Sequence, residues 1–282
     1  MRSGQDSGVR RSLFLLAVAV AAALVASTHA ARRPDRFDSK RAFAFLRWQV
    51  ELGPRPAGSV ESRALAAHIV KLLPGARYQS VPGGLRNVVY TVRGRDSKRY
   101  VVVGAHYDTK DYPGFVGAND GASGTAVVYE LARALRPRAV RPTVVFIFFD
   151  GEEAPDDSSF EQNGTRGSRV AAQAYRHAQA MILLDMIGDR SLAIPKEQGS
   201  NERLFARVRA SASRVGVGRV FVGRTVTILD DHVPFARAGV PSVDLIDFSF
   251  PCWHKPCDDL TAVSAASLDV VGETVSDVLR GF

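Results

Sequence analysis

Short apolar runs that lead into metal-binding side chains impose the strongest constraint on how this sequence can fold. The clearest run lies at 144–149, after Pro142, and leads into Asp150-Gly151-Glu152-Glu153. Its length and its β-branched and aromatic residues predict a buried central strand. An isolated Glu-Glu pair is usually a solvated acidic turn. Two carboxylates buried at a strand end, by contrast, need a cation or a catalytic proton to offset the cost of burial.

The same pattern recurs in three other places, which favours a buried site over an acidic turn. Apolar residues 100–105 lead into His106, residues 181–184 lead into Asp185, and residues 240–246 are soon followed by His254. This order of strands, polar residues and helical segments predicts an α/β fold, a single domain with a mostly parallel, twisted central sheet flanked by helices. Because ligands bind outside the carboxyl ends of such strands, we expect a metal site at that edge of the sheet.

Five side chains in these positions form a mixed set of nitrogen and oxygen donors: His106, Asp120, Glu153, Asp185 and His254. Two imidazoles with three carboxylates suit zinc, and cobalt or manganese are the alternatives. We therefore expect one or two zinc ions as the cofactor.

The N-terminus has the features of an export signal. Arg10 and Arg11 precede an apolar run at 13–26, and Thr28-His29-Ala30 supplies small residues for cleavage. The run is shorter than the roughly twenty apolar residues that span a bilayer. We predict a cleaved signal at 1–30 and one α/β domain at 31–282, in an exported protein that is secreted or extracytoplasmic and has no membrane span after cleavage. A retained N-terminal anchor is the alternative.

The charge of the chain gives no sign of a nucleic-acid partner. The sequence has 37 Lys and Arg residues against 29 Asp and Glu residues, a formal net charge of +8. Its arginines are scattered over predicted helices, and no basic stripe carries interleaved aromatic residues. Solvated helix faces explain these charges best.

The two cysteines of the sequence, Cys252 and Cys257, flank His254. In an exported protein, two such neighbours are expected to form a disulfide. Closing so small a loop adds little entropic stability, so its effect would be local and would fix the segment that presents His254. Zinc ligation by the two thiolates is the competing interpretation.

The rest of the chain alternates helices and strands. Helices are predicted at 39–52, 59–73, 121–135, 166–176, 201–215, 233–238 and 267–279. Strands are predicted at 87–92, 100–105, 144–149, 181–185, near Val220 and at 242–246. Residues 154–165 form a long aperiodic loop directly after Glu153, and a loop of this length at an active edge is usually a lid or a specificity element.

On its motifs, the chain resembles the superfamily of zinc-dependent exported aminopeptidases and glutaminyl-peptide cyclotransferases, from residue 53 to the last predicted helix. The residues that carry the resemblance are Ala105-His106-Tyr107-Asp108, Asn119-Asp120-Gly121-Ala122-Ser123-Gly124, Glu152-Glu153, Leu184-Asp185-Met186 and Trp253-His254. The resemblance implies that Asp120, Glu153 and His254 bind the metal common to both branches. In two-metal members, His106 and Asp185 bind a second ion and Asp120 bridges the two.

The resemblance also implies roles for residues outside this ligand set. Glu152 would be the general acid/base, and Asp108 would orient His106 through its other ring nitrogen. His232 is expected to be structural or to support the site from outside the ligand set. Trp253 is expected to form a wall of the substrate pocket, with packing in the core as the alternative.

A bridging carboxylate must point both oxygens into the site while its backbone starts a helix. In relatives, a cis peptide bond that does not involve proline satisfies this geometric requirement. We therefore expect a cis bond between Asp120 and Gly121, even though such bonds are rare and costly.

Several features favour the cyclotransferase branch. Asp230 stands where aminopeptidases typically have serine, and in cyclotransferases this acid joins a hydrogen-bonded carboxylate chain with the residues that match Glu152 and Asp185. The motif from His106 to Lys110 and the long segment after Glu153 point the same way. Two features point to aminopeptidases instead. The sequence of the motif at 119–124 is closer to the aminopeptidase version, and residues 154–165 lack the tryptophan that animal cyclotransferases have there.

We therefore expect an enzyme that acts on peptide or protein N-termini. It would cyclise N-terminal glutamine to pyroglutamate and release ammonia, with Glu152, Asp185 and Asp230 as its catalytic residues. A zinc aminopeptidase that removes N-terminal residues is the alternative. A non-catalytic binding domain on this fold usually loses ligands or the general base, and here every position is filled.

Overall fold

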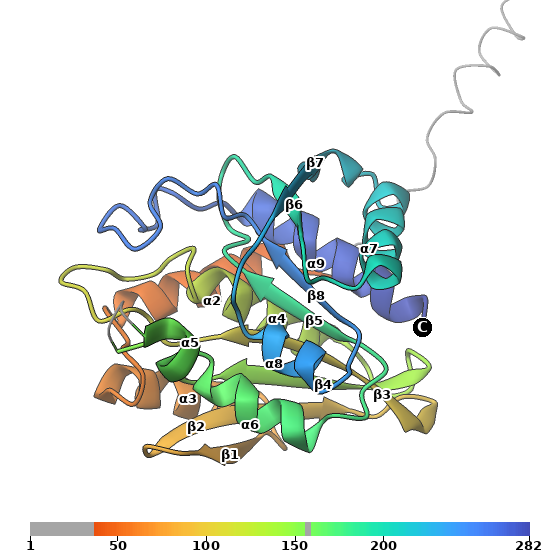
Figure 1. Ribbon diagram of the computed structural model, residues 1–282, viewed down its shortest axis with the longest axis horizontal. Helices are drawn as coiled ribbons and strands as arrows, with labels where there is room; N and C mark the ends of the chain where they lie inside the picture. Colours follow the sequence, from red (N-terminus) through yellow and green to blue (C-terminus); the bar gives the residue numbers. More distant parts are fainter. Residues whose placement is uncertain (1–36, 156–158) are drawn as a thin grey trace, which may run out of the picture. The chain divides into compact units, whose positions relative to one another are not determined.

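In the computed structural model, which describes residues 37–155 and 159–282, a six-stranded sheet is covered by helices on both faces (Figure 1). The strands in spatial order are β1 Arg77–Val81, β2 Leu85–Val92, β4 Pro142–Phe149, β3 Asp96–His106, β5 Met181–Asp185 and β8 Ser242–Ile246. β1 and β2 pair antiparallel, as do β2 and β4, whereas β4, β3, β5 and β8 are parallel to one another. The predicted α/β fold with a mostly parallel central sheet is confirmed. The predicted export signal at 1–30 lies outside the described residues.

One layer of helices contributes to the larger apolar core: α2 Ser39–Glu51, α3 Val60–Leu72, α4 Ala122–Ala134, α7 Glu202–Arg214 and α9 Ala265–Arg280. The opposite layer contains α6 Arg166–Ala174 and α8 His232–Arg237. A short helix, α5 Phe160–Asn163, precedes α6, and a turn of 3-10 helix at Gly218–Val220 leads into a two-stranded parallel sheet of β6 Ile194–Glu197 and β7 Phe221–Val226. No helix within 37–155 or 159–282 has both the length and the apolar character needed to cross a bilayer.

Strand β4 shows why the central strands appear in the sequence as unbroken apolar runs. Val144, Phe146 and Phe148 face one core, and the residues between them face the other. All of β4 is buried. A parallel strand with helices on both faces has no solvent-facing side, so it needs apolar residues at every position.

The sequence prediction missed the two strands that lack such a run. β1 lies at the edge of the sheet and exposes most of its residues, and β6 is short and contains Pro195. Helix α9 begins slightly earlier than predicted, because the Ser264 side chain accepts a hydrogen bond from the Ser267 N–H and caps the helix. The predicted loop at 154–165 contains α5.

The strand order brings the polar residues of the parallel strands to one edge of the sheet. His106 ends β3, Asp185 ends β5, and Glu152 and Glu153 follow β4. β4 lies on one side of β3 and β5 lies on the other, so the direction in which the chain adds strands reverses at β3. Such a switch point leaves a crevice at the carboxyl ends of the strands.

Candidate active site

Two groups of acidic and imidazole side chains meet at this edge of the sheet, and Asp120 belongs to both. One group contains His106, Asp120 and Asp185, and the other contains Asp120, Glu153 and His254. Within each group, one ligand atom from each residue lies within 4.8 Å of the others. The structure therefore brings together all five candidate metal ligands that were predicted from the sequence.

Asp120 presents one carboxylate oxygen to each group. Its Oδ1 lies 3.3 Å from His106 Nε2, and its Oδ2 lies 3.5 Å from His254 Nε2. His106 Nε2 also lies 3.1 Å from Asp185 Oδ1, and His254 Nε2 lies 3.2 Å from Glu153 Oε1. This donor set fits zinc, which accepts both imidazole nitrogen and carboxylate oxygen.

The concentration of buried acids perturbs their protonation. Burial is the main cause that raises the pKa of Glu152 and of Asp230 well above the usual carboxyl range, and neighbouring carboxylates add to it. Burial also raises the pKa of Glu153 and Asp185. For His106, burial acts to lower the pKa, but the contacts with Asp120 and Asp185 outweigh it and raise the pKa well above its usual value. A cation bound among these groups would relieve the repulsion between the carboxylates.

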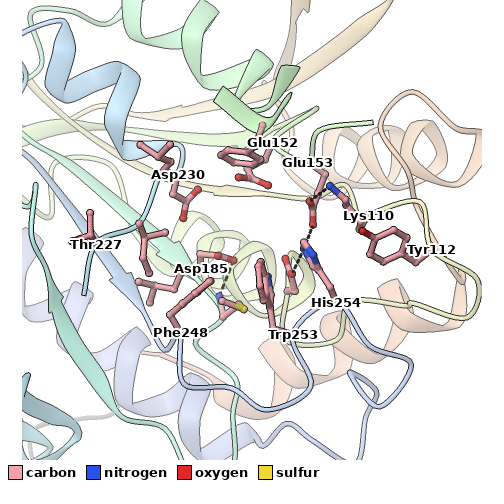
Figure 2. Close-up of a pocket in the computed structure, with 16 residues that line it drawn as sticks. Lys110, Tyr112, Glu152, Glu153, Asp185, Thr227, Asp230, Phe248, Trp253 and His254 are labelled. Atoms are coloured by element: carbon pink, nitrogen blue, oxygen red, sulfur yellow. Dashed lines mark hydrogen bonds and ion pairs between the residues drawn. The ribbon is translucent and has the colours of Figure 1, made fainter. Parts of the chain in front are cut away.

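A cavity of about 520 Å³ lies beside the candidate ligands (Figure 2). Glu152, Asp185 and Asp230 line it from three different parts of the chain: the loop after β4, the end of β5, and the segment before α8. Its apolar lining comes from Phe160, Met186, Ile228, Leu229, Ile246, Phe248 and Trp253. Asp120 and Glu153 line it as well, so the cavity combines five carboxyl groups with an extended apolar wall.

Trp253 lies at this cavity and not in the core. Its side chain is 42% exposed, and its ring stacks on His254 with 4.3 Å between the ring centroids. Phe248 packs on it at a centroid distance of 4.8 Å. The alternative of core packing for Trp253 therefore does not describe its surroundings.

His232 lies at the start of α8 and belongs to neither candidate metal group among the described residues. It is buried between two acids, with Nε2 3.1 Å from Glu197 Oε2 and Nδ1 3.5 Å from Asp244 Oδ2. Burial acts to lower the pKa of His232, but the close contact with Glu197 and the charge of Asp244 outweigh it and raise the pKa. His232 thus links β6 to β8 beside the segment that carries Asp230.

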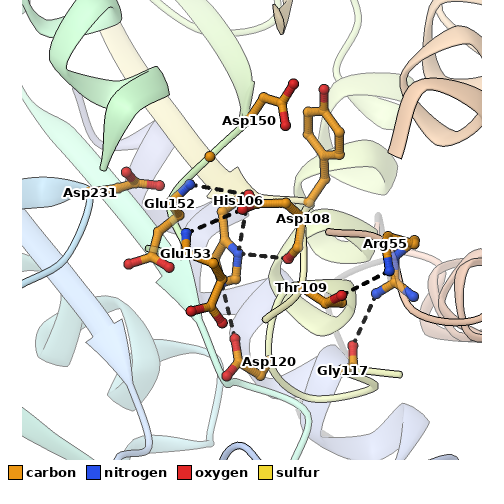
Figure 3. Close-up of polar contacts among 12 residues, drawn as sticks. Arg55, His106, Asp108, Thr109, Gly117, Asp120, Asp150, Glu152, Glu153 and Asp231 are labelled. Atoms are coloured by element: carbon orange, nitrogen blue, oxygen red, sulfur yellow. Dashed lines mark hydrogen bonds and ion pairs between the residues drawn. The ribbon is translucent and has the colours of Figure 1, made fainter. Parts of the chain in front are cut away.

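Asp108 contacts the other ring nitrogen of His106, as expected, but through its backbone. His106 Nδ1 lies 3.1 Å from the backbone carbonyl oxygen of Asp108 and 3.8 Å from its carboxylate. The carboxylate instead accepts hydrogen bonds from the N–H groups of Glu152 and Glu153, both at 3.2 Å (Figure 3). Both acceptors are within reach of the imidazole from two residues away, so the sequence does not distinguish them. Asp108 orients His106 with its backbone and fixes the glutamate pair with its side chain.

The expected cis bond between Asp120 and Gly121 is wrong, because no peptide bond within 37–155 or 159–282 is cis. Gly121 instead turns the chain with a φ of +89°, which glycine adopts without a steric penalty. A Cβ at this position would lie 2.8 Å from the carbonyl oxygen of Asp108. The absence of a side chain at Gly121 therefore lets the chain turn from Asp120 into α4.

Arg55 supports the loop that carries Asp120. No role for Arg55 was predicted from the sequence. The guanidinium is fully buried, and its Nη1 donates to the carbonyl oxygens of Gly53 and Val116 at 2.8 and 2.9 Å. Its Nη2 donates to the carbonyl oxygen of Gly117 at 3.3 Å (Figure 3). Burial lowers the pKa of Arg55 to about 10, against the opposing effect of nearby Asp258, Asp108 and Asp120. Its position between Pro54 and Pro56 was the only sign of a fixed role.

Two further residues at the site, Asp258 and Lys110, were not predicted from the sequence. The Asp258 carboxylate accepts hydrogen bonds from the N–H groups of Asn119 and Asp120, at 2.6 and 3.0 Å. Lys110 lines the cavity although it is only 3% exposed, and its Nζ lies 3.9 Å from Glu153 Oε2. Lys110 therefore adds a basic side chain to a site rich in carboxyl groups. Its position as the last residue of the motif that begins at His106 was the available signal.

Known proteins are similar to this chain in sequence and in fold. The sequence profile of Peptidase family M28 matches residues 87–279. The glutaminyl-peptide cyclotransferase of Bothrops jararaca is 30% identical, over 83% of this chain and 79% of that protein. The one from Drosophila melanogaster is also 30% identical, and the match spans 65% of this chain and 61% of that protein.

Solved structures with a similar fold carry names from both branches. A leucine aminopeptidase precursor from Bacteroides thetaiotaomicron superposes with a TM-score of 0.80 at 27% identity, covering 87% of this chain and 98% of that one. The glutaminyl cyclase of an Acidobacteriales bacterium superposes with a TM-score of 0.78 at 29% identity, covering 90% of this chain and 97% of that one.

Proposed function

Because the chain belongs to Peptidase family M28 and places a third carboxyl group, Asp230, in the cavity beside Glu152 and Asp185, we propose that it is a zinc-dependent glutaminyl-peptide cyclotransferase. Such an enzyme converts the N-terminal glutamine of a peptide or protein to pyroglutamate and releases ammonia. Asp230 carries the proposal, since the family resemblance implies an acid at this position in cyclotransferases and a serine in aminopeptidases. The cyclotransferase names of the relatives from Bothrops jararaca and Drosophila melanogaster support it.

In this proposal, Asp120, Glu153 and His254 hold the zinc ion needed for the reaction. Asp120 also completes a second candidate group with His106 and Asp185. Bound zinc would polarise the side-chain carbonyl of the substrate glutamine and stabilise the negative charge that develops on its oxygen.

Glu152 would move the proton in this reaction. It takes a proton from the α-amine of the substrate, and the amine nitrogen then attacks the side-chain amide carbon to close the five-membered ring. The bond from that carbon to the amide nitrogen breaks, and Glu152 returns the proton to the departing ammonia. Burial raises the pKa of Glu152, which favours uptake of a proton near neutral pH. Asp185 and Asp230 line the same cavity and would share protons with Glu152, while Trp253 would form a wall of the substrate pocket.

Aminopeptidase activity is the second candidate function. It is favoured by the complete second group of His106, Asp120 and Asp185, and by the similarity to the leucine aminopeptidase precursor. Glu152 would then deprotonate a water molecule that attacks the first peptide bond. The cavity has room for a side chain larger than glutamine.

A substrate panel separates the two activities. We expect ammonia release from peptides that begin with glutamine, and little release of chromophore from leucyl or alanyl amides. Peptides that begin with asparagine are the matched control, because one methylene fewer would require a strained four-membered ring. Rapid cleavage of the amides without ammonia release would establish the aminopeptidase instead, and inactivity of the zinc-loaded protein on both would contradict either enzyme.

We also propose that residues 1–30 are a cleaved export signal and that residues 31–282 form the exported domain, secreted or extracytoplasmic. The disulfide between Cys252 and Cys257 supports an oxidising compartment. N-terminal sequencing of protein collected outside the cytoplasm should therefore begin at Ala31. A sequence that begins at Met1 would favour a retained anchor.

Thiol titration of the exported protein tests its oxidation state. The unfolded, unreduced protein should contain no reactive thiol, because its only two cysteines are cross-linked. The same protein after reduction is the control and should react with two equivalents of reagent. Two reactive thiols before reduction would contradict the disulfide and favour a metal or redox role for the pair.

A further inference from the structure

A cross-linked loop after β8 carries one candidate metal ligand and contacts the backbone of another. Cys252 and Cys257 are joined by a disulfide with their Cα atoms 5.4 Å apart, and His254 lies inside the loop that this bond closes. Inside the loop, the Lys255 N–H donates to the Cys252 carbonyl oxygen at 3.0 Å. Cys252 is half-buried and Cys257 is exposed, so the bond is open to reagents from solvent.

His254 adopts a backbone conformation that its side chain disfavours. Its φ is +55°, in the left-handed region where a Cβ is crowded by the backbone. A residue other than glycine remains in this region only where its surroundings hold it there. Packing supplies part of this support, because the imidazole meets the rings of Tyr112 and Phe115 edge-on at centroid distances of 5.8 and 5.7 Å. The stacked ring of Trp253 and the contact of Nε2 with Glu153 add to this support. The loop backbone on either side of His254 is a further constraint.

The same loop also reaches Asp120. Asp258 follows Cys257 directly, and its buried carboxylate accepts the N–H groups of Asn119 and Asp120. Its carbonyl oxygen accepts the N–H of Ala118 at 3.2 Å. The Asp258 N–H donates to the Lys255 carbonyl oxygen at 3.0 Å, which connects this anchor to the cross-linked loop.

We propose that the Cys252–Cys257 disulfide positions the metal site, by holding His254 in its left-handed conformation and by keeping Asp258 against the backbone of Asp120. Without the bond, the loop gains conformations in which His254 leaves its left-handed state, so metal binding must first restore the ordered one. The effect falls on the group of Asp120, Glu153 and His254. The group of His106, Asp120 and Asp185 shares only Asp120 with it. This inference rests on the metal site of the proposed function and not on which of the two activities the enzyme has.

The test measures metal affinity in place of activity. The variant is Cys252→Ser/Cys257→Ser, and its zinc affinity is measured by competition with a chromogenic chelator. We expect the dissociation constant to rise at least about tenfold, the scale observed when residues that orient metal ligands are removed. The matched control is Lys255→Ala, an exposed change in the same loop that keeps the disulfide, and its affinity should stay within about twofold of wild type. The visible absorption spectrum of bound cobalt should change in the double variant and not in the control, because it reports ligand geometry.

Reduction of the folded wild-type protein gives a second measurement that does not depend on folding of the variant. A water-soluble phosphine reduces the disulfide by two electrons, each sulfur gains a proton, and the phosphine takes an oxygen from water to become its oxide. After removal of the reagent without oxygen, the wild-type affinity should fall toward that of the double variant, and the double variant should not respond to the same treatment.

Three outcomes would overturn the inference. An unchanged affinity in both the double variant and the reduced protein would show that the loop holds its geometry without the bond. Tighter zinc binding after reduction would show that the thiols act as ligands. If the wild-type protein bound no zinc, both this inference and the proposed zinc enzyme would fail, whereas normal zinc binding without cyclase activity would affect the proposed function alone.

Discussion

Replacing Glu152 with glutamine is expected to lower turnover of peptides that begin with glutamine by at least about a hundredfold, the scale of a lost general acid/base. Glutamine keeps the size of glutamate but cannot accept the proton from the substrate amine. Zinc content should stay near that of wild type, because Glu152 lines the cavity but belongs to neither candidate metal group. Initial rates and metal analysis on the same preparation measure the two effects.

Glu153→Gln is the matched variant, since it makes the same change at the neighbouring residue. Glu153 Oε1 lies 3.2 Å from His254 Nε2, so loss of its charge removes a donor from one metal group. We expect Glu153→Gln to lose most of its zinc. Both variants retain the backbone N–H groups that bind Asp108, so neither change removes that anchor. If Glu152→Gln loses zinc while Glu153→Gln keeps it, the two roles are reversed.

Strands at the site such as β5 and β8 could be predicted from the sequence because they are parallel and buried along their whole length. β5 and β8 have the bounds that their apolar runs predict, Met181–Asp185 and Ser242–Ile246. A strand covered on both faces needs apolar residues throughout, and such a run stands out in any sequence. β1 lies at the edge and exposes most of its residues, so its composition carries no comparable signal.

The candidate ligands could be found for a related reason. Carboxylates and imidazoles at the ends of buried strands are costly unless something compensates them, so their recurrence indicates a common site. Contacts made by the backbone could not be predicted in this way. The Asp108 carbonyl oxygen contacts His106, and the N–H groups of Asn119 and Asp120 bind Asp258. Every residue has the same backbone groups, so no pattern of side chains shows which ones a site uses.

The buried charges around Asp120 connect the fold to the chemistry. Glu152, Asp185 and Asp230 line one cavity, and burial raises the pKa of each. His106 opposes this accumulation of acids directly. Lys110 near Glu153 and Arg55 beneath the loop before Asp120 add positive charge around it. Lys110 and Arg55 occupy different surroundings. Lys110 lines the cavity, whereas the Arg55 guanidinium donates to backbone carbonyl oxygens.

Replacing Arg55 with methionine is expected to destabilise the fold by about 3–5 kcal/mol, the cost of breaking a buried charged network by removing one partner. The guanidinium donates to the carbonyl oxygens of Gln49, Gly53, Val116 and Gly117. Methionine fills much of the same space but donates no hydrogen bond, so all four carbonyl oxygens lose the guanidinium as a donor. The Gln49 and Gly117 oxygens keep the N–H groups of Leu52 and Ala122. It also removes the cation that offsets Asp258 and Asp120.

Thermal unfolding of the metal-free protein measures this effect without a contribution from zinc. For a domain of this size, the expected loss lowers Tm by on the order of 10 °C. Arg63→Met is the matched control, because Arg63 is exposed on α3 and the same exchange there should leave Tm within about 2 °C of wild type. Arg55→Lys should fall between wild type and Arg55→Met, since lysine keeps the charge but cannot reach several carbonyl oxygens with a planar fork. If Arg55→Met and Arg63→Met unfold at the same temperature, the buried guanidinium does not hold the loop that carries Asp120.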